Sequence, residues 1–185
     1  MPLFGRKKDT EYEEAALLLT EGDADSAIAK LRELIERHPN HTNALTTLGV
    51  ALIQSIEGQN HDSFVVEEAM AFLNRAADSN PKDPVPLFNK AVCLRNLGRL
   101  EEALEVFDQT LEREGRFALA ILHKAEIHYE LGNYEEAIEL ARLAIIRDPA
   151  VANTMSWVKD AMEKAGLLDE DGNPIDRPPK QPKMF

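Results

Sequence analysis

Between residues 84 and 151 the same pattern of hydrophobic positions occurs twice, in two consecutive segments. In each segment apolar residues recur every three or four positions in two runs, which is the pattern of two helices that each bury one side. Small residues interrupt these runs at matching places: Ala91 and Ala103, then Ala125 and Ala137. Two helices approach closely only where the facing side chains are small. The pattern therefore predicts two helical hairpins with a close helix crossing at each pair of alanines.

Glycine marks the same place in both segments. Gly98 and Gly132 lie thirty-four residues apart, where the first helix of each hairpin must end. Glycine suits that position because it readily adopts the left-handed backbone conformation. A pair of glutamates follows each glycine, in the first turn of the next helix, where the helix dipole favours carboxylates. Asp148-Pro149 closes the second hairpin, since proline cannot continue a helix interior. A fixed period of this length indicates stacked supersecondary units.

These residues resemble the tetratricopeptide repeat, whose thirty-four-residue unit is a helical hairpin. The resemblance rests on two matching segments, Asn96–Ala103 and Glu130–Ala137. It implies an all-α fold: a right-handed solenoid of about four such hairpins with a C-terminal capping helix. Extending the spacing in both directions places the repeats at 8–41, 42–83, 84–117 and 118–151 and the capping helix at 152–165. Neighbouring hairpins must stack, because one hairpin cannot bury its apolar face alone.

The first two repeats carry their own signals. Asp23 is a plausible N-cap for a helix running from Ala24 to Arg37. The second repeat has forty-two residues instead of thirty-four, and the eight additional residues, 56–63, predict a loop with Asp62 or Ser63 capping the next helix. Insertions of this kind map to one edge of a solenoid, often near a binding surface. A loop that has drifted without a role is the alternative.

The two ends of the chain differ from the repeats. We expect residues 1–7 to form a flexible arm, in which Leu3 and Phe4 lie next to basic residues. This arm would either bind weakly to an anionic membrane or dock on the first helix. At 166–185 we expect a Pro-rich tail without regular structure, in which Asp169–Pro174 forms a turn or linker and Arg177–Lys183 favours an extended polyproline conformation. Pro179 and Pro182 form a PxxP pair, but the flanking residues do not complete an SH3-type ligand.

Composition narrows the possible functions. The formal net charge of −12 argues against a general nucleic-acid binder, because phosphate contacts need a basic surface. The single cysteine, Cys93, excludes an intramolecular disulfide and fits a reducing compartment; its apolar neighbours predict that it is buried. No apolar run approaches the ~18 residues of a membrane-spanning helix, and no secretory signal is present. We expect a cytoplasmic protein.

The sequence offers no catalytic or metal-binding constellation. His38 and His41 flank Pro39 at a predicted helix end, and His123 and His128 point about 140° apart on one helix. Neither pair suits a metal ion. No glycine-rich phosphate loop is present. We therefore expect no enzymatic activity, no cofactor and no metal.

The family resemblance supplies a candidate site. It implies that the second, fifth, sixth, ninth, twelfth and thirteenth positions of each repeat face a concave groove. The expected groove residues are Asn43, Thr47, Val50, Gln54, Val85, Phe88, Asn89, Val92, Asn96, Leu119, Leu122, His123, Glu126 and Tyr129. One subclass of the family clamps a C-terminal carboxylate with lysines and arginine. Asn89 matches its central asparagine, but the other clamp positions hold Thr46, Val50, Leu119 and His123, none of which supplies the cations, so that interpretation fails.

What remains is an apolar strip with amides beside it, which suits the backbone and the apolar side chains of a bound segment. The leading hypothesis is a non-catalytic protein–protein interaction scaffold or adaptor. Its partner would be another protein or peptide segment with apolar anchors and basic flanks. Two alternatives stay open: an assembly chaperone that holds an unassembled subunit, and a structural protein that self-associates.

Overall fold

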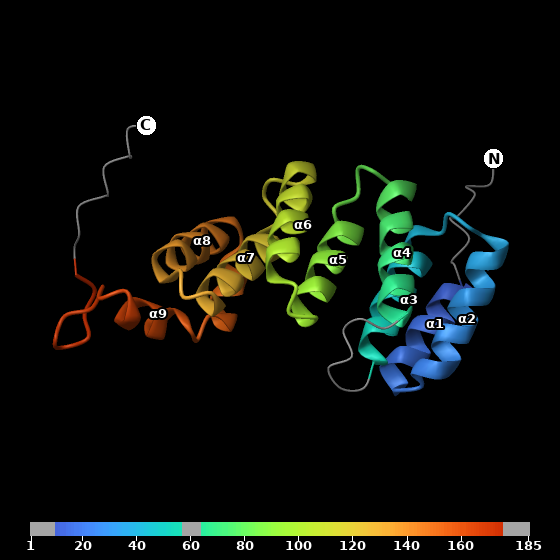
Figure 1. Ribbon diagram of the computed structural model, residues 1–185, viewed down its shortest axis with the longest axis horizontal. Coiled ribbons are helices and arrows are strands. Elements are labelled where there is room, and N and C mark those ends of the chain that lie inside the picture. The colour runs from blue at the N-terminus through green and yellow to red at the C-terminus, as the bar shows by residue number, and fades with distance from the viewer. Residues whose placement is uncertain (1–9, 57–63, 176–185) are drawn as a thin grey trace, which may run out of the picture. The chain divides into compact units, whose positions relative to one another are not determined.

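The computed structural model describes residues 10–56 and 64–175 (Figure 1). The chain divides into two compact units, Met1–Gly115 and Arg116–Phe185, named below the N-terminal and the C-terminal unit. Over the described ranges, the secondary structure is helical apart from one isolated antiparallel bridge between Leu168 and Pro174. The prediction of an all-α fold is confirmed.

The N-terminal unit consists of helical hairpins. They are α1 (Thr10–Glu21) with α2 (Ala24–Arg37), α3 (Thr42–Gln54) with α4 (Phe64–Ser79), and α5 (Val85–Asn96) with α6 (Leu100–Arg113). Successive hairpins stack, because α2 packs on α3 and α4 packs on α5. The first helices also contact one another in turn, α1 with α3 and α3 with α5. Through these contacts α1, α3 and α5 form one layer of this unit, with α3 in the middle.

The hairpins of this unit close around small residues. Gly49 of α3 lies so near α4 that a methyl group in place of its hydrogen would sit 2.6 Å from Cγ of Leu73. Ala15, Ala91 and Ala103 have no exposed surface. Leucines fill the space on either side: Leu31, Leu34, Leu45, Leu48 and Leu73 are all but fully buried. The expected burial of the small residues is therefore confirmed.

Glycines end the first helices, as the sequence predicts. Gly98 has φ +73° and Gly132 has φ +77°, both in the left-handed region. In each case the following N–H donates to the carbonyl five residues back: Arg99 to Leu94 at 2.9 Å, and Asn133 to His128 at 2.8 Å. This is the Schellman pattern that satisfies the last free carbonyls of a helix.

Side chains cap the beginnings of several helices. Asp23 Oδ1 accepts a hydrogen bond from the Ser26 N–H at 3.1 Å, and α2 extends over Ala24–Arg37, so both predictions are confirmed. His41 caps α3 by accepting from the Ala44 N–H through Nδ1 at 3.1 Å, a role that the sequence did not indicate. The cap predicted at Asp62 or Ser63 lies outside the described residues.

The C-terminal unit contains α7 (Ala118–Glu130), α8 (Tyr134–Arg147), the 3-10 helix η1 (Pro149–Thr154) and α9 (Val158–Lys164). A single capping helix over 152–165 is therefore wrong, because the chain breaks between η1 and α9. At the break the Met155 N–H donates to the Ala152 carbonyl at 3.3 Å and the Val158 N–H to the Met155 carbonyl at 3.1 Å, so the backbone turns there with bonds three residues back instead of the four of an α-helix. The shorter α9 still packs on α8.

The chain beyond α9 folds back in a compact turn. Gly166 has φ +64° and ends α9 as Gly132 ends α7, thirty-four residues earlier. The Ile175 N–H then donates to the Leu167 carbonyl at 2.8 Å, and Asp169 caps the turn between them. The described part of the expected tail, residues 166–175, thus contains the turn that the sequence predicts at Asp169–Pro174, together with one isolated bridge. The arm at 1–7, the loop residues 57–63 and the tail from 176 lie outside the described residues.

Candidate protein-binding groove

A cleft of about 220 Å³ opens on the layer formed by α1, α3 and α5. Helix α3 supplies half of its lining residues, with α1 on one side and the start of α5 on the other. Six of the residues expected in the groove line this cleft together: Asn43, Thr47, Val50, Gln54, Val85 and Asn89. Residues selected by their repeat positions on α3 and α5 thus lie around a single cleft within the N-terminal unit.

The cleft has an apolar side. Val50 is half-buried, and Val85 keeps 44% of its surface exposed at the first turn of α5. Leu19 of α1 adds an apolar side chain across from them. Valine and leucine side chains that stay partly in contact with water gain from covering by another apolar group. This side of the cleft can therefore hold an apolar anchor.

Polar groups stand next to that apolar side. Asn43 and Gln54 are exposed at the two ends of α3, where their amides can both donate and accept hydrogen bonds. Asn89 Nδ2 donates to the Val85 carbonyl of its own helix at 2.9 Å, which holds the side chain against α5. Amides placed in this way match the alternating donors and acceptors of a peptide backbone.

Helix α1 also lines the cleft, with Tyr12 and Leu19, which are not among the expected groove residues. The Tyr12 hydroxyl and Thr47 Oγ1 lie 3.1 Å apart in a hydrogen bond that joins α1 to α3. The Tyr12 ring also lies 5.6 Å from the His41 ring. Tyr12 and Leu19 occupy the fifth and twelfth positions of repeat 8–41. The rule that selected the other groove residues would have found both, had it been applied to the first repeat.

The remaining expected residues of the N-terminal unit lie outside the cleft. Phe88 is half-buried, and its ring lies 6.0 Å from that of Phe107, which has no exposed surface. Its side chain therefore belongs in part to the core. Val92 is half-buried and Asn96 is exposed, and neither lines the cleft.

In the C-terminal unit, the expectation that Leu122 faces a groove is wrong. Leu122 is 4% exposed because it stands one helical turn from Ala118 and Ala125, which are both buried on the same stripe of α7. Leu119 is 45% exposed. His123 Nδ1 and Glu126 Oε2 lie 3.1 Å apart, so these two half-buried side chains pair along the helix.

The charge of the cleft is negative. Asp83 lies at its rim, and Oδ1 of this carboxylate accepts from the Val85 N–H at 2.9 Å. Among the described residues that line the cleft there is no lysine, arginine or histidine. A ligand carboxylate in this cleft would meet none of the cations that a carboxylate clamp needs.

The described parts of the chain give little support for a metal site, a reactive thiol or a membrane-spanning helix. There, no group of three or more His, Cys, Asp or Glu side chains is placed to hold a metal ion. Burial raises the pKa of the Cys93 thiol to about 12, which disfavours the reactive thiolate. Within residues 10–56 and 64–175, no helix combines the length and the apolar character needed to cross a membrane.

Comparison with known proteins supplies the family. The model of the tetratricopeptide repeat matches residues 12–62 and 87–152. Over 49 residues, the chain is 47% identical to the uncharacterized protein MJ0572 of Methanocaldococcus jannaschii. That match covers 26% of this chain and 57% of the relative, so it spans little more than half of the relative's length.

Solved structures show the same fold. TTC0263, described as a thermophilic TPR protein of Thermus thermophilus, is similar with a TM-score of 0.70 at 21% identity, over 83% of this chain and 80% of that one. MamA is similar with a TM-score of 0.67 at 18% identity, over 85% of this chain and 86% of that one. At these identities the likeness establishes the fold alone.

Proposed function

Since the chain belongs to the tetratricopeptide repeat family, whose fold supports protein-interaction scaffolds in general, we propose that it is a non-catalytic scaffold or adaptor. Its ligand is a segment of a partner protein that lies in the cleft between α1, α3 and α5. The observation that carries this proposal is the composition of the cleft, in which an apolar side is flanked by amides.

The size of the cleft limits what enters it. A hollow of about 220 Å³ is smaller than most small-molecule pockets, which are roughly 300–1,000 Å³. It suits one or two apolar side chains of a longer segment, whose backbone then runs past Asn43 and Asn89. Affinity would come from burying those anchors, and the amides would fix the register of the backbone.

The negative charge of the chain indicates a positively charged partner segment. The net charge of −12 and the carboxylate of Asp83 at the rim favour lysine or arginine beside the anchors of the bound segment. Complementary charge mainly accelerates association and makes it sensitive to salt. We therefore expect a basic segment whose binding weakens as the ionic strength rises.

The proposal is tested by affinity purification of the full chain from its native cells, alongside a double variant, Asn43→Glu with Val85→Glu. Both substitutions place a carboxylate in the first turn of a helix, where the dipole tolerates it, so the fold should survive. The added charges must be desolvated when an apolar anchor enters, so partner capture should fall at least tenfold.

The matched control is Leu17→Glu, which changes another exposed apolar residue of the same unit, 56% exposed and not part of the cleft. It should capture the partner as the unaltered chain does. Circular dichroism must first show equal melting of all three proteins. If the double variant retained the partner that the unaltered chain captures, at the same strength, the cleft would not be the binding site.

A further inference from the structure

A lysine of the C-terminal unit lies against two tyrosine rings. The ammonium nitrogen of Lys164, in α9, is 5.3 Å from the centre of the Tyr129 ring and 5.5 Å from that of the Tyr134 ring. The two rings come from α7 and α8, with centres 5.9 Å apart and planes inclined by 57°. They form a wedge with the ammonium in its opening. The Trp157 ring lies 5.1 Å from the Tyr129 ring and supports it.

A carboxylate completes this environment. Asp160 Oδ2 accepts a hydrogen bond from the Tyr129 hydroxyl at 2.6 Å and lies 2.7 Å from Nζ of Lys164. The hydrogen bond with Asp160 raises the pKa of Lys164, so the amine is charged at neutral pH. Two aromatic faces and one carboxylate around a cation are the groups that attract an alkylammonium ion. The four side chains are named the ammonium wedge: Tyr129, Tyr134, Asp160 and Lys164.

The lysine in the wedge is held weakly enough to leave. Lys164 and Asp160 keep 46% and 44% of their side-chain surface exposed. Ion pairs with such exposure contribute little to stability, because water screens them and the long side chain loses freedom. Lys164 can therefore swing into solvent at small cost, which leaves the two rings and the carboxylate for another cation.

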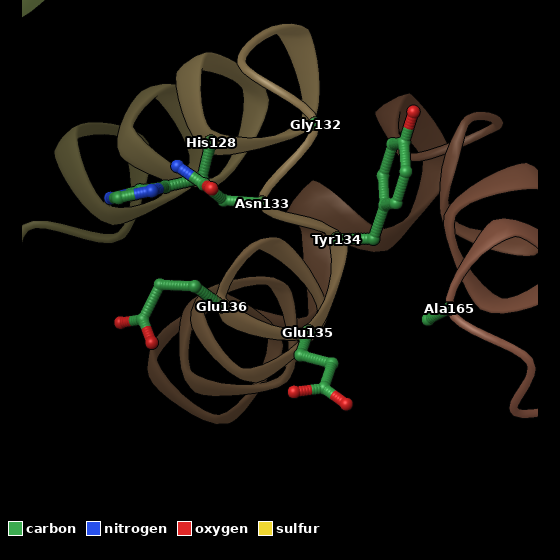
Figure 2. Close-up of a pocket in the computed structure, with 7 residues that line it drawn as sticks. All are labelled: His128, Gly132, Asn133, Tyr134, Glu135, Glu136 and Ala165. Atoms are coloured by element: carbon green, nitrogen blue, oxygen red, sulfur yellow. The ribbon is translucent and has the colours of Figure 1, made fainter.

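A cleft shares Tyr134 with the wedge. It measures about 620 Å³ and is lined by Tyr134, Glu135, Glu136 and Ala165, the last being the neighbour of Lys164. Figure 2 shows Tyr134 projecting from the start of α8 on the side toward Ala165, while Glu136 and His128 project on the other side. Its two glutamates complement a basic chain.

We propose that Tyr129, Tyr134 and Asp160 form a binding site for the ammonium group of a lysine on a partner protein, and that Lys164 fills this site until the partner binds. The occupant is an unmodified lysine because Asp160 accepts an N–H from the bound amine, and a trimethylated amine has no N–H to donate. The site stands independently of the groove proposal, since its residues all belong to the C-terminal unit.

The fluorescence of Trp157 reports on binding directly, because it is the only tryptophan of the chain and its ring contacts Tyr129. The full chain and its Lys164→Ala variant are titrated with lysine capped by acetyl and methylamide groups, at constant ionic strength. We expect a saturable change in fluorescence for both proteins, with half-saturation at a several-fold lower concentration for Lys164→Ala, because the internal competitor is gone. Capped norleucine, which has the chain without the charge, should give no saturable change.

Two further arms keep the test decisive. Adding Tyr134→Leu to the Lys164→Ala variant removes one ring and should weaken the response several-fold, with melting checked by circular dichroism. Capped trimethyllysine should bind more weakly than capped lysine; tighter binding would overturn the assignment to an unmodified amine. A response that is equal in all variants, or absent from Lys164→Ala, would overturn the site itself.

Discussion

Replacing Gly49 by alanine tests how closely α3 and α4 cross. The added Cβ would lie 2.6 Å from Leu73 Cγ and 3.0 Å from the Ala69 carbonyl oxygen, whereas carbon atoms prefer separations of about 3.5–4.0 Å. Leu73 and Ala69 have no exposed surface, so neither has open space to move into. The helices must separate by nearly an ångström, or Leu73 must leave its rotamer.

Two opposing effects set the magnitude. Overpacking of a filled core costs about 1–3 kcal/mol, while alanine is better than glycine in a helix interior by about 0.8–1 kcal/mol. The steric effect is larger because the contact involves backbone and a branched carbon, both of which resist displacement. The difference between the two effects predicts that Gly49→Ala lowers the free energy of unfolding by up to about 2 kcal/mol.

Urea unfolding followed by far-ultraviolet circular dichroism measures the loss. The matched control is Gly115→Ala, where the new Cβ meets only the Leu111 carbonyl oxygen, at an ordinary 3.6 Å. That variant should be unchanged or slightly more stable, because alanine restricts the unfolded chain. If Gly49→Ala were as stable as Gly115→Ala, helix propensity would outweigh packing and the close crossing would be refuted.

Three other predictions follow from the core and the surface. Ala103→Leu and Ala137→Leu should each lower the urea midpoint by the equivalent of about 1–3 kcal/mol, because neither alanine has exposed surface; unchanged midpoints would mean that they lie away from the crossings. Cys93, with its pKa raised to about 12, should react with a thiol reagent at mildly alkaline pH only after unfolding, and reaction as fast as that of free cysteine would show that it is accessible. Arg32 lowers the pKa of Glu68, so this pair stabilises the fold above the unfolded pKa near 4.5 and loses its effect as the pH falls through the lower, folded value. Melting curves should therefore show Glu68→Gln less stable than the unaltered chain at neutral pH and equal to it once the pH lies below the folded pKa, and a difference that persisted in acid would contradict the ion-pair explanation.

The sequence predicted the features that depend on local backbone chemistry. Gly98 and Gly132 take the left-handed conformation, and Asp23 caps α2, because these effects involve only residues within one turn. The small residues at the crossings were also predictable, since their period of thirty-four is visible in the sequence. The break between η1 and α9 was not, because the apolar spacing of 151–162 fits one continuous helix equally well.

The candidate groove was predictable only in part. Six expected residues line one cleft, but Leu122 is buried because the stripe of α7 that packs inward is wide enough to include it. A rule based on repeat positions cannot distinguish the edge of a buried stripe from the exposed face beside it. Repeat positions could not predict the ammonium wedge, because Tyr129, Tyr134 and Lys164 come together only when α7, α8 and α9 pack.

The most direct test of the scaffold function is to locate the bound segment on the full chain. Once affinity purification has identified the partner and its shortest binding peptide, hydrogen–deuterium exchange of the chain is compared with and without that peptide. We expect increased protection in α3 and in the first turns of α5, around Thr47, Val50 and Val85, where the cleft lies. Protection confined to α2, α4 or α6, with α3 and α5 unchanged, would contradict binding in the cleft.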